Sequence, residues 1–211
     1  MGFWGAVRDV WGDDALRDIA ARLPPETRRA TFDEIVLALS WLPSGYISDW
    51  HEAVWNGPAK QDDALFCRFV DRSVELGFGR MQRFFLKLAT PKQLVERAPE
   101  MWRRQHTHGQ ITVSVRGHYE HALPEAQGSP SADDTAAPPV ATVTLRDHPF
   151  VNRAVSRRAL AEVWRHILTL ARAKDATESH RVEAAPPSGA PGARGEAGEA
   201  AALVVRLSWT R

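Results

Sequence analysis

The sequence has few of the residues that cross-link or anchor a small protein. It contains a single cysteine, Cys67, among 211 residues, which excludes an internal disulfide and a cysteine-based zinc knuckle. Cys67 lies in an apolar helical stretch, where a free thiol usually packs as a small hydrophobic side chain. No apolar run approaches the length of a membrane span. We therefore expect neither disulfides nor a membrane-spanning segment.

An excess of charge of one sign is also lacking. The 27 Lys and Arg residues nearly balance 26 Asp and Glu residues, which leaves a net charge of +1. Such a chain gives no electrostatic reason to expect a nucleic-acid partner. Residues 1–6 lack the basic stretch and the long apolar run of a secretory signal. We expect a cytoplasmic protein.

Sequence motifs of common enzymes are missing as well. There is no Gly-x-Ser-x-Gly, no P-loop and no Gly-x-Gly-x-x-Gly. Adjacent carboxylates, as at 13–14 and 62–63, suit helix starts better than an acid/base pair. The chain is therefore expected not to be an enzyme.

The clearest pattern present is the order of elements in the second half. Residues 111–116, 141–146 and 203–209 alternate apolar and polar side chains, which is typical of half-buried strands. Residues 151–174 follow the period of an amphipathic helix. A further strand is expected after this helix, so the order is two strands, one helix and two strands.

The first half is helical in pattern. Segments 124–139 and 185–200 are rich in Pro, Gly, Ala and Ser and are predicted to be disordered loops between strands. We predict one α+β domain over 1–211, in which a helical half, 1–109, packs on a four-stranded antiparallel sheet of ββαββ order in 110–211. The helices are expected at 3–22, 25–39, 48–55, 62–88 and 90–108.

Several short segments carry a resemblance to a known domain class. They are Gly79–Ala89 with Thr90 and Pro91, then Leu94, Trp102, Gly109, His148, Pro149 and Leu207–Trp209. With the element order, they resemble vinyl-reductase-type ligand-sensing domains and TRAPP-complex subunits, and most of all a myxobacterial paralogous family. The resemblance implies a pocket for a small molecule or acyl chain between sheet and helices, and a helix-mediated homodimer. Cysteines near the last strands, frequent in vinyl-reductase-type domains, are absent here.

Histidines are clustered enough to raise the question of a metal. If the first two strands pair antiparallel, His148 approaches His106 and His108 at one edge of the sheet. Three imidazoles with an open fourth position form a catalytic zinc arrangement. The spacing matches no recognised metal motif, and histidines at a helix end are favourable there as cations. We therefore expect no metal.

Haem requires an axial ligand in an apolar setting, and His166 is flanked by apolar residues of the long helix. A histidine on the seam of an amphipathic helix is more often a hydrogen-bonded boundary residue. We therefore expect no haem and no other cofactor.

Tryptophan is abundant, with eight residues. Three of them fall on predicted inner faces with two phenylalanines nearby, and core packing explains most such rings. A ligand pocket lined by these rings also fits the composition of small-molecule sites, and two arginines could meet a ligand carboxylate. The residues of this predicted pocket are Trp102, Trp164, Trp209, Phe84, Phe85, Arg80 and Arg83.

Three functional hypotheses follow. The preferred one is a non-enzymatic sensory or regulatory protein that binds an apolar small molecule between the long helix and the sheet. The second is a dimerising scaffold without ligand, because the stripe Phe3, Trp4, Val7 and Trp11 is more apolar than a terminal helix needs. The third is a metal hydrolase that uses the three clustered histidines.

Overall fold

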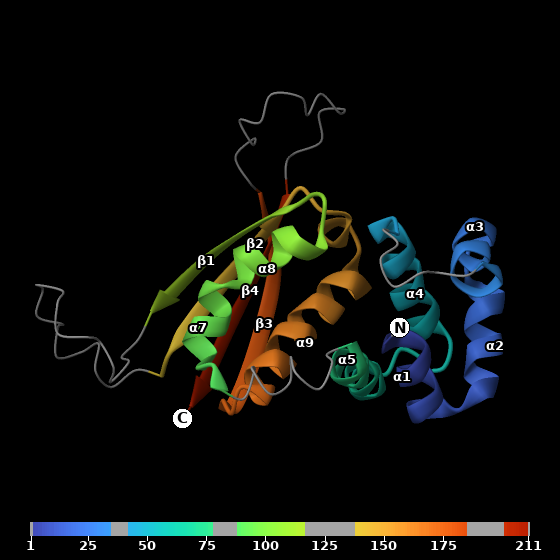
Figure 1. Cartoon of the computed structure of the whole chain (residues 1–211), viewed down its shortest axis with the longest axis horizontal. Helices are drawn as coiled ribbons and strands as arrows, with labels where there is room; N and C mark the ends of the chain where they lie inside the picture. Colours follow the sequence, from blue (N-terminus) through green and yellow to red (C-terminus); the bar gives the residue numbers. More distant parts are fainter. Residues whose placement is uncertain (1, 35–41, 78–87, 117–137, 185–200, 211) are drawn as a thin grey trace, which may run out of the picture. The chain divides into compact units, whose positions relative to one another are not determined.

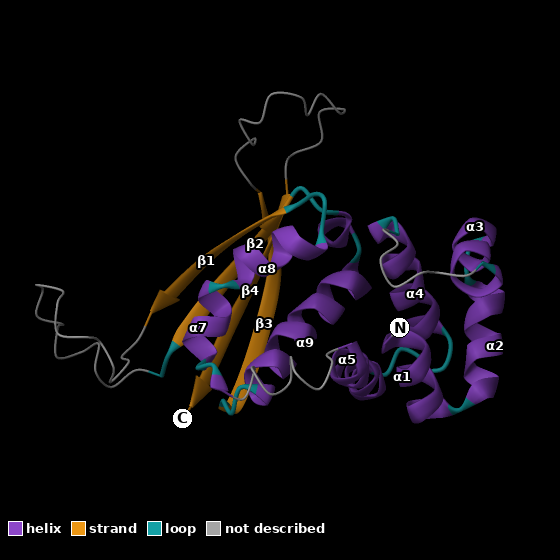
Figure 2. Ribbon diagram, viewed as in Figure 1, coloured by secondary structure: helices purple, strands orange, loops and turns teal. Residues whose placement is uncertain are grey.

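The chain forms helices and one sheet (Figures 1 and 2). A computed structural model describes residues 2–34, 42–77, 88–116, 138–184 and 201–210. The α+β class and the ββαββ order are confirmed. Two compact units are present, Met1–Phe84 with Pro149–His166 and Phe85–His148 with Ile167–Arg211. The single domain over 1–211 stays a prediction. Within the described ranges, no helix is long and apolar enough to cross a membrane.

The first unit, here called the helical unit, contains short helices. They are α1 (Gly2–Trp11), α2 (Asp13–Arg22), α3 (Pro25–Arg28), the π-helical turn η1 (Arg29–Asp33), α4 (Ser44–Asn56), α5 (Asp63–Gly77), the 3-10 turn η3 (Pro149–Asn152) and most of α9 (Ala154–Leu170). The single helix expected over 3–22 is in fact two helices. Gly12 separates them with a φ of 85°, a conformation that is strained for residues other than glycine.

Aromatic rings fill the core of the helical unit. Phe69 on α5 is fully buried, and its ring centroid lies 5.7 Å from Phe3, 6.0 Å from Trp11 and 6.2 Å from Phe66. Val7 of the same N-terminal stripe is also fully buried. Part of the stripe on α1 therefore packs against the core of its own unit, and Phe3, Trp4 and Trp11 are partly buried. The scaffold hypothesis stays a prediction. The homodimer stays a prediction.

The second unit, here called the sheet unit, contains the four strands. Its elements are α7 (Pro91–Glu96), α8 (Ala98–Gln105), β1 (Gln110–Arg116), β2 (Val140–Arg146), β3 (Lys174–Ala184), β4 (Ala201–Thr210) and the end of α9. The strands lie in the order β1-β2-β4-β3, and every pairing is antiparallel. Helices α7 and α8 contact β1 (Figure 1).

Local sequence explains where the elements of the sheet unit begin. Thr90 and Gln93 form a reciprocal capping box at the start of α7, and Pro91 takes the first turn. On β2, Ala141, Val143 and Leu145 are buried, as the alternating pattern predicts. The register pairs Ile111 with Leu145, so apolar residues of the two strands share a face. Predicted and observed ends of these two strands differ by one residue at most.

The aromatic core gives a stability test. Phe69→Ala should lower the free energy of unfolding by about 3–5 kcal/mol, the usual cost of deleting a buried phenylalanine ring. Leu76→Ala on the same helix, where Leu76 is 38% exposed, should cost less than about 1 kcal/mol. Urea denaturation followed by circular dichroism measures both. Equal losses would show that Phe69 is not part of the core.

Candidate functional site

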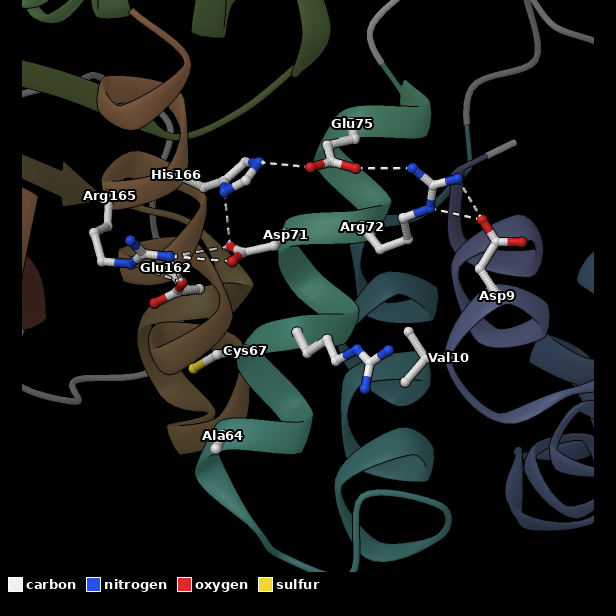
Figure 3. Close-up of a pocket in the computed structure, with 11 residues that line it drawn as sticks. Asp9, Val10, Ala64, Cys67, Asp71, Arg72, Glu75, Glu162, Arg165 and His166 are labelled. Carbon is white, nitrogen blue, oxygen red and sulfur yellow. Dashed lines mark hydrogen bonds and ion pairs between the residues drawn. The ribbon is translucent and has the colours of Figure 1, made fainter. Parts of the chain in front are cut away.

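A charged cavity of about 560 Å³ lies among α1, α5 and α9 within the helical unit (Figure 3). Its lining residues are Asp9, Val10, Ala64, Cys67, Arg68, Asp71, Arg72, Glu75, Glu162, Arg165 and His166. Most of them are ionisable. The largest part of the wall comes from one face of α5 and the facing turns of α9.

Glu162 is the most buried charge of this cavity, with a side chain only 3% exposed. Arg165 donates to its Oε1 over 2.8 Å from Nε, and Arg158 donates to its Oε2 over 3.2 Å from Nη1. Burial alone would raise the pKa of Glu162, but hydrogen bonds from Arg165 and Asp71 and the nearby guanidinium charges outweigh it, so the pKa is lowered. Glu162 is therefore a buried carboxylate that two arginines keep ionised.

Asp71 on α5 faces Glu162 and Arg165 of α9. Its Oδ1 lies 3.1 Å from His166 Nδ1, and its Oδ2 lies 3.1 Å from Arg165 Nη2. Burial raises the pKa of Asp71, and its hydrogen bond with Glu162 raises it further, against the opposing effect of His166. The pKa of Glu162 is thus lowered and that of Asp71 is raised, as expected for two carboxyl groups that share one proton.

The network continues to α1. His166 Nε2 lies 3.7 Å from Glu75 Oε1, Glu75 accepts from Arg72 over 2.8 Å, and Arg72 Nε donates to Asp9 over 2.6 Å (Figure 3). A continuous series of charged contacts therefore runs from α1 through α5 to α9. Within the part of the chain that the structure describes, no group of three His, Cys, Asp or Glu side chains is placed to hold a metal ion.

Cys67 lies beside the buried carboxylate. Arg158 Nη2 is 2.6 Å from its Sγ. Burial, followed by the charge of Glu162, raises the pKa of the Cys67 thiol to about 12. The thiol is therefore protonated at neutral pH and is not a nucleophile. Most charges of the cavity wall are thus paired with one another, and these pairs connect α1, α5 and α9.

Sequence reasoning missed this network. Its members come from three segments, α1, α5 and α9. The contact between Arg165 and Asp71 joins residues that are 94 positions apart along the chain. A signal was nevertheless present on α9, where Glu162 stands inside an apolar stripe with Arg158 four residues before it and Arg165 three residues after it. That spacing places both guanidinium groups over one carboxylate.

The predicted histidine cluster forms in the sheet unit. The rings of His106 and His148 lie 5.2 Å apart, those of His108 and His148 lie 5.0 Å apart, and Trp102 stacks on His106 at 3.7 Å. Gly109, with a φ of 82°, has no room for a side chain, since a Cβ there would lie 3.0 Å from His148. The close approach of the backbone packs the imidazoles together.

Burial and neighbouring charge lower the pKa of two imidazoles of this cluster, His106 and His148. Burial, followed by the charge of His108, lowers the pKa of His106 to about 4. Burial, followed by the charges of His106 and His108, lowers the pKa of His148 to about 3. His106 stacks on Trp102 and His108 stacks on His148, whereas His148 meets the rings of His106 and Trp102 edge-on. The described residues thus give the metal-hydrolase hypothesis no support.

The residues of the predicted aromatic pocket are distributed between the units. Trp164 belongs to the helical unit, and Trp102 and Trp209 belong to the sheet unit. All three are buried, at 7%, 7% and 2% exposure. Arg80, Arg83, Phe84 and Phe85 lie outside the described residues. A ligand wall made of these side chains stays a prediction.

His51 is a functional candidate that the sequence did not single out. It is 6% exposed in the helical unit, and its ring centroid lies 5.7 Å from Phe3 and 6.0 Å from Phe150. Its Nδ1 lies 3.4 Å from the Ser156 hydroxyl oxygen. Burial lowers the pKa of His51 to about 4, so the imidazole is neutral.

Comparison with known proteins identifies the fold. No sequence family profile matches the chain, and no curated protein sequence matches it. An oxygen-binding H-NOX domain related to soluble guanylate cyclases, solved in its oxygen complex, has a TM-score of 0.52 at 10% identity, and the match covers 100% of this chain and 92% of that one. The Fe(II) unliganded mutant of an H-NOX protein from K. algicida has a TM-score of 0.53 at 9% identity, and the match covers 100% of this chain and 94% of that one. A structure from work on heme redox potential and porphyrin distortion has a TM-score of 0.54 at 10% identity. The match covers 98% of this chain and 96% of that one.

Two expectations from the sequence are wrong. The chain has the H-NOX fold, so its resemblance to TRAPP-complex subunits and vinyl-reductase-type domains, and to the myxobacterial family, does not describe it. The expectation of no cofactor is overturned by the same comparison, because these neighbours are described as heme proteins.

The buried carboxylate predicts an unequal response of two acidic residues. Glu162→Gln should lower the free energy of unfolding by about 1.5–3 kcal/mol, because the partly buried Arg158 and Arg165 each lose one of their two carboxylate partners. Asp71→Asn should cost less, because burial already favours the neutral form of Asp71. Asp14→Asn, in a pair whose Asp14 side chain is 87% exposed, should change stability by less than about 0.5 kcal/mol. Denaturant unfolding at pH 7 measures the three values, and a smaller loss for Glu162→Gln than for Asp71→Asn would contradict the assignment.

His51 predicts acid sensitivity. Its pKa is about 4 in the folded chain and about 6.5 when exposed, so the unfolded chain binds the proton first and stability falls as pH drops from 6.5 to 4. At pH 5 this group should account for a loss of about 2 kcal/mol relative to pH 7. His51→Phe should remove that part of the loss, whereas Ser156→Ala, which keeps the imidazole, should retain it. Urea titrations at the two pH values test this, and parallel losses in wild type and His51→Phe would contradict it.

Proposed function

We propose that this chain is a sensory domain that binds a small molecule and reports it by a change of conformation rather than by catalysis. The H-NOX fold over the whole chain carries this proposal. One solved neighbour is described as an oxygen-binding domain related to soluble guanylate cyclases. The non-enzymatic part is supported by the charged cavity, where the carboxylates are paired and the Cys67 thiol has a pKa of about 12.

Haem is the first ligand to consider, because the solved neighbours are described as heme proteins. A haem iron takes a side-chain ligand such as a neutral imidazole, whose second nitrogen is held by a hydrogen bond. His51 has this chemistry through Ser156, but rings of Phe3, Phe66 and Phe150 pack around it. Its surroundings leave no space for a porphyrin.

The other described histidines meet the requirement less well. His166 lies in a charged cavity between Asp71 and Glu75. His106, His108 and His148 pack against one another and against Trp102 in their cluster, and His180 lies 3.4 Å from Glu178 on β3. The described residues therefore do not build a haem site by themselves, and haem as the ligand rests on the fold comparison.

Helix α9 is the element suited to transmit a signal. Its residues 154–166 belong to the helical unit and 167–170 to the sheet unit, so one continuous helix is common to both. The ion pairs of Arg165 with Asp71 and of Arg158 with Asp63 join the first part of α9 to α5. We propose that ligand binding acts on the contact of α9 with α5, because packed helices shift against one another when a ligand favours one arrangement.

Spectroscopy of the full chain tests the proposal. The protein is produced with haem supplied, and the absorption spectrum and the haem-to-protein ratio are measured. We expect a Soret band at about one haem per chain and a band shift on adding carbon monoxide, as for a ligated haem with an open position. Single alanine variants of His106, His108, His148 and His166 then identify the iron ligand by loss or shift of the band.

Native mass spectrometry separates the two parts of the proposal. A bound mass that is lost on denaturation, without a Soret band, would retain the sensory function and overturn haem as its ligand. A folded chain that carries no bound molecule and takes up no haem would overturn the sensory function itself.

A further inference from the structure

A second cavity of the helical unit is smaller than the charged one and has an apolar wall. It has a volume of about 180 Å³ and lies among α1, η1 and α4. Four aromatic side chains, Phe3, Trp4, Tyr46 and Trp50, form most of its wall, and no polar atom of the wall is exposed to it. Neither the charged network nor the histidine cluster contributes to this cavity.

The polar groups nearest to the cavity are already satisfied. Trp50 Nε1 donates to the Thr31 hydroxyl oxygen over 3.2 Å, and that hydroxyl donates to the backbone carbonyl of Thr27 over 2.7 Å. A buried water needs two to four polar partners, and this wall offers none. The cavity therefore favours an apolar occupant over water.

The volume sets the size of that occupant. An apolar cavity of about 150 Å³ is large enough to hold benzene, whereas sites for drug-sized ligands measure about 300–1,000 Å³. At about 180 Å³, this cavity has space for one ring with a short substituent. A porphyrin or a long acyl chain is too large for it.

The wall is preorganised for a ring. Phe32 stacks on Trp50 at 5.3 Å with an interplanar angle of 3°, and its ring centroid lies 4.5 Å from that of Trp4. One phenylalanine ring therefore supports both indoles. Trp50 then faces Trp4 at 6.5 Å and Phe3 at 6.1 Å, both tilted by 32°. Aromatic groups attract one another at centroid distances of about 4.5–7 Å in tilted or offset arrangements. Leu42, which also lines the cavity, is 39% exposed, so the site reaches solvent.

We propose that this cavity is a binding site for a small hydrocarbon with a single ring, here called the aromatic site. It does not depend on haem, because its walls contain neither a histidine nor a charged residue. Binding would stabilise the packing of α1 on α4, since the ring contacts side chains of both helices.

Toluene is the probe for the aromatic site, and phenol is its polar counterpart of similar size. The full chain is titrated with each, and the indole N–H signals are followed by NMR after assignment with single tryptophan variants. We expect saturable shifts at Trp4 and Trp50 with toluene and none at Trp209. Phenol should bind about tenfold or more weakly, because its hydroxyl finds no partner in the wall.

Two variants with matched controls decide the outcome. Ile47→Trp should fill the cavity and Leu42→Glu should place a carboxylate at its exposed side, and each should weaken toluene binding by at least about tenfold. Leu88→Trp and Leu88→Glu, at a residue that is 65% exposed elsewhere, should leave binding unchanged. Leu42→Glu alone is decisive where Ile47→Trp does not fold. Shifts that do not saturate, or toluene affinity equal to wild type in the folded variants, would overturn the site.

Discussion

A carboxylate buried inside a helical unit is the constraint around which the rest of that unit is arranged. Removing an ionised group from water costs several kcal/mol unless opposite charges and hydrogen bonds replace its hydration. Glu162 meets this requirement only when Arg158 and Arg165 turn toward it and α5 presents Asp71. The position of α9 on α5 is thereby specified by direction and charge, whereas apolar contacts alone tolerate rotation and sliding.

The two units use different means to fix their interiors. Rings from α1, α4 and α5 interlock in the helical unit, and strand register determines the sheet unit. Similarity to H-NOX domains extends over the whole chain at only 9–12% identity. Such a fold persists because many apolar sequences satisfy the same element order and packing, whereas specific functional side chains need not be retained. The ligand must therefore be established for this chain by its own chemistry.

Much of the fold was predictable, and most of the candidate site was not. Alternation along 111–116 and 141–146 identified β1 and β2 because side-chain direction in a strand repeats every two residues. Antiparallel pairing then brought His148 to His106, as expected. The break at Gly12 was missed because the apolar period continues across it. The Asp71–Arg165 contact joins positions 94 residues apart, and local periodicity carries no information on such a pair.

The position of the single cysteine makes the reactivity of its thiol depend on the contact between α9 and α5. Cys67 lies where Arg158 reaches across from α9, and its thiol remains protonated in the closed arrangement. An electrophile that attacks only thiolates will modify it chiefly in the moments when α9 lifts from α5 and the pKa of the thiol returns toward its ordinary value. The rate of modification then depends on how often the contact between α9 and α5 opens, as the rate of amide exchange does for a backbone group. Cys67 is thus a native chemical probe of the contact between α9 and α5.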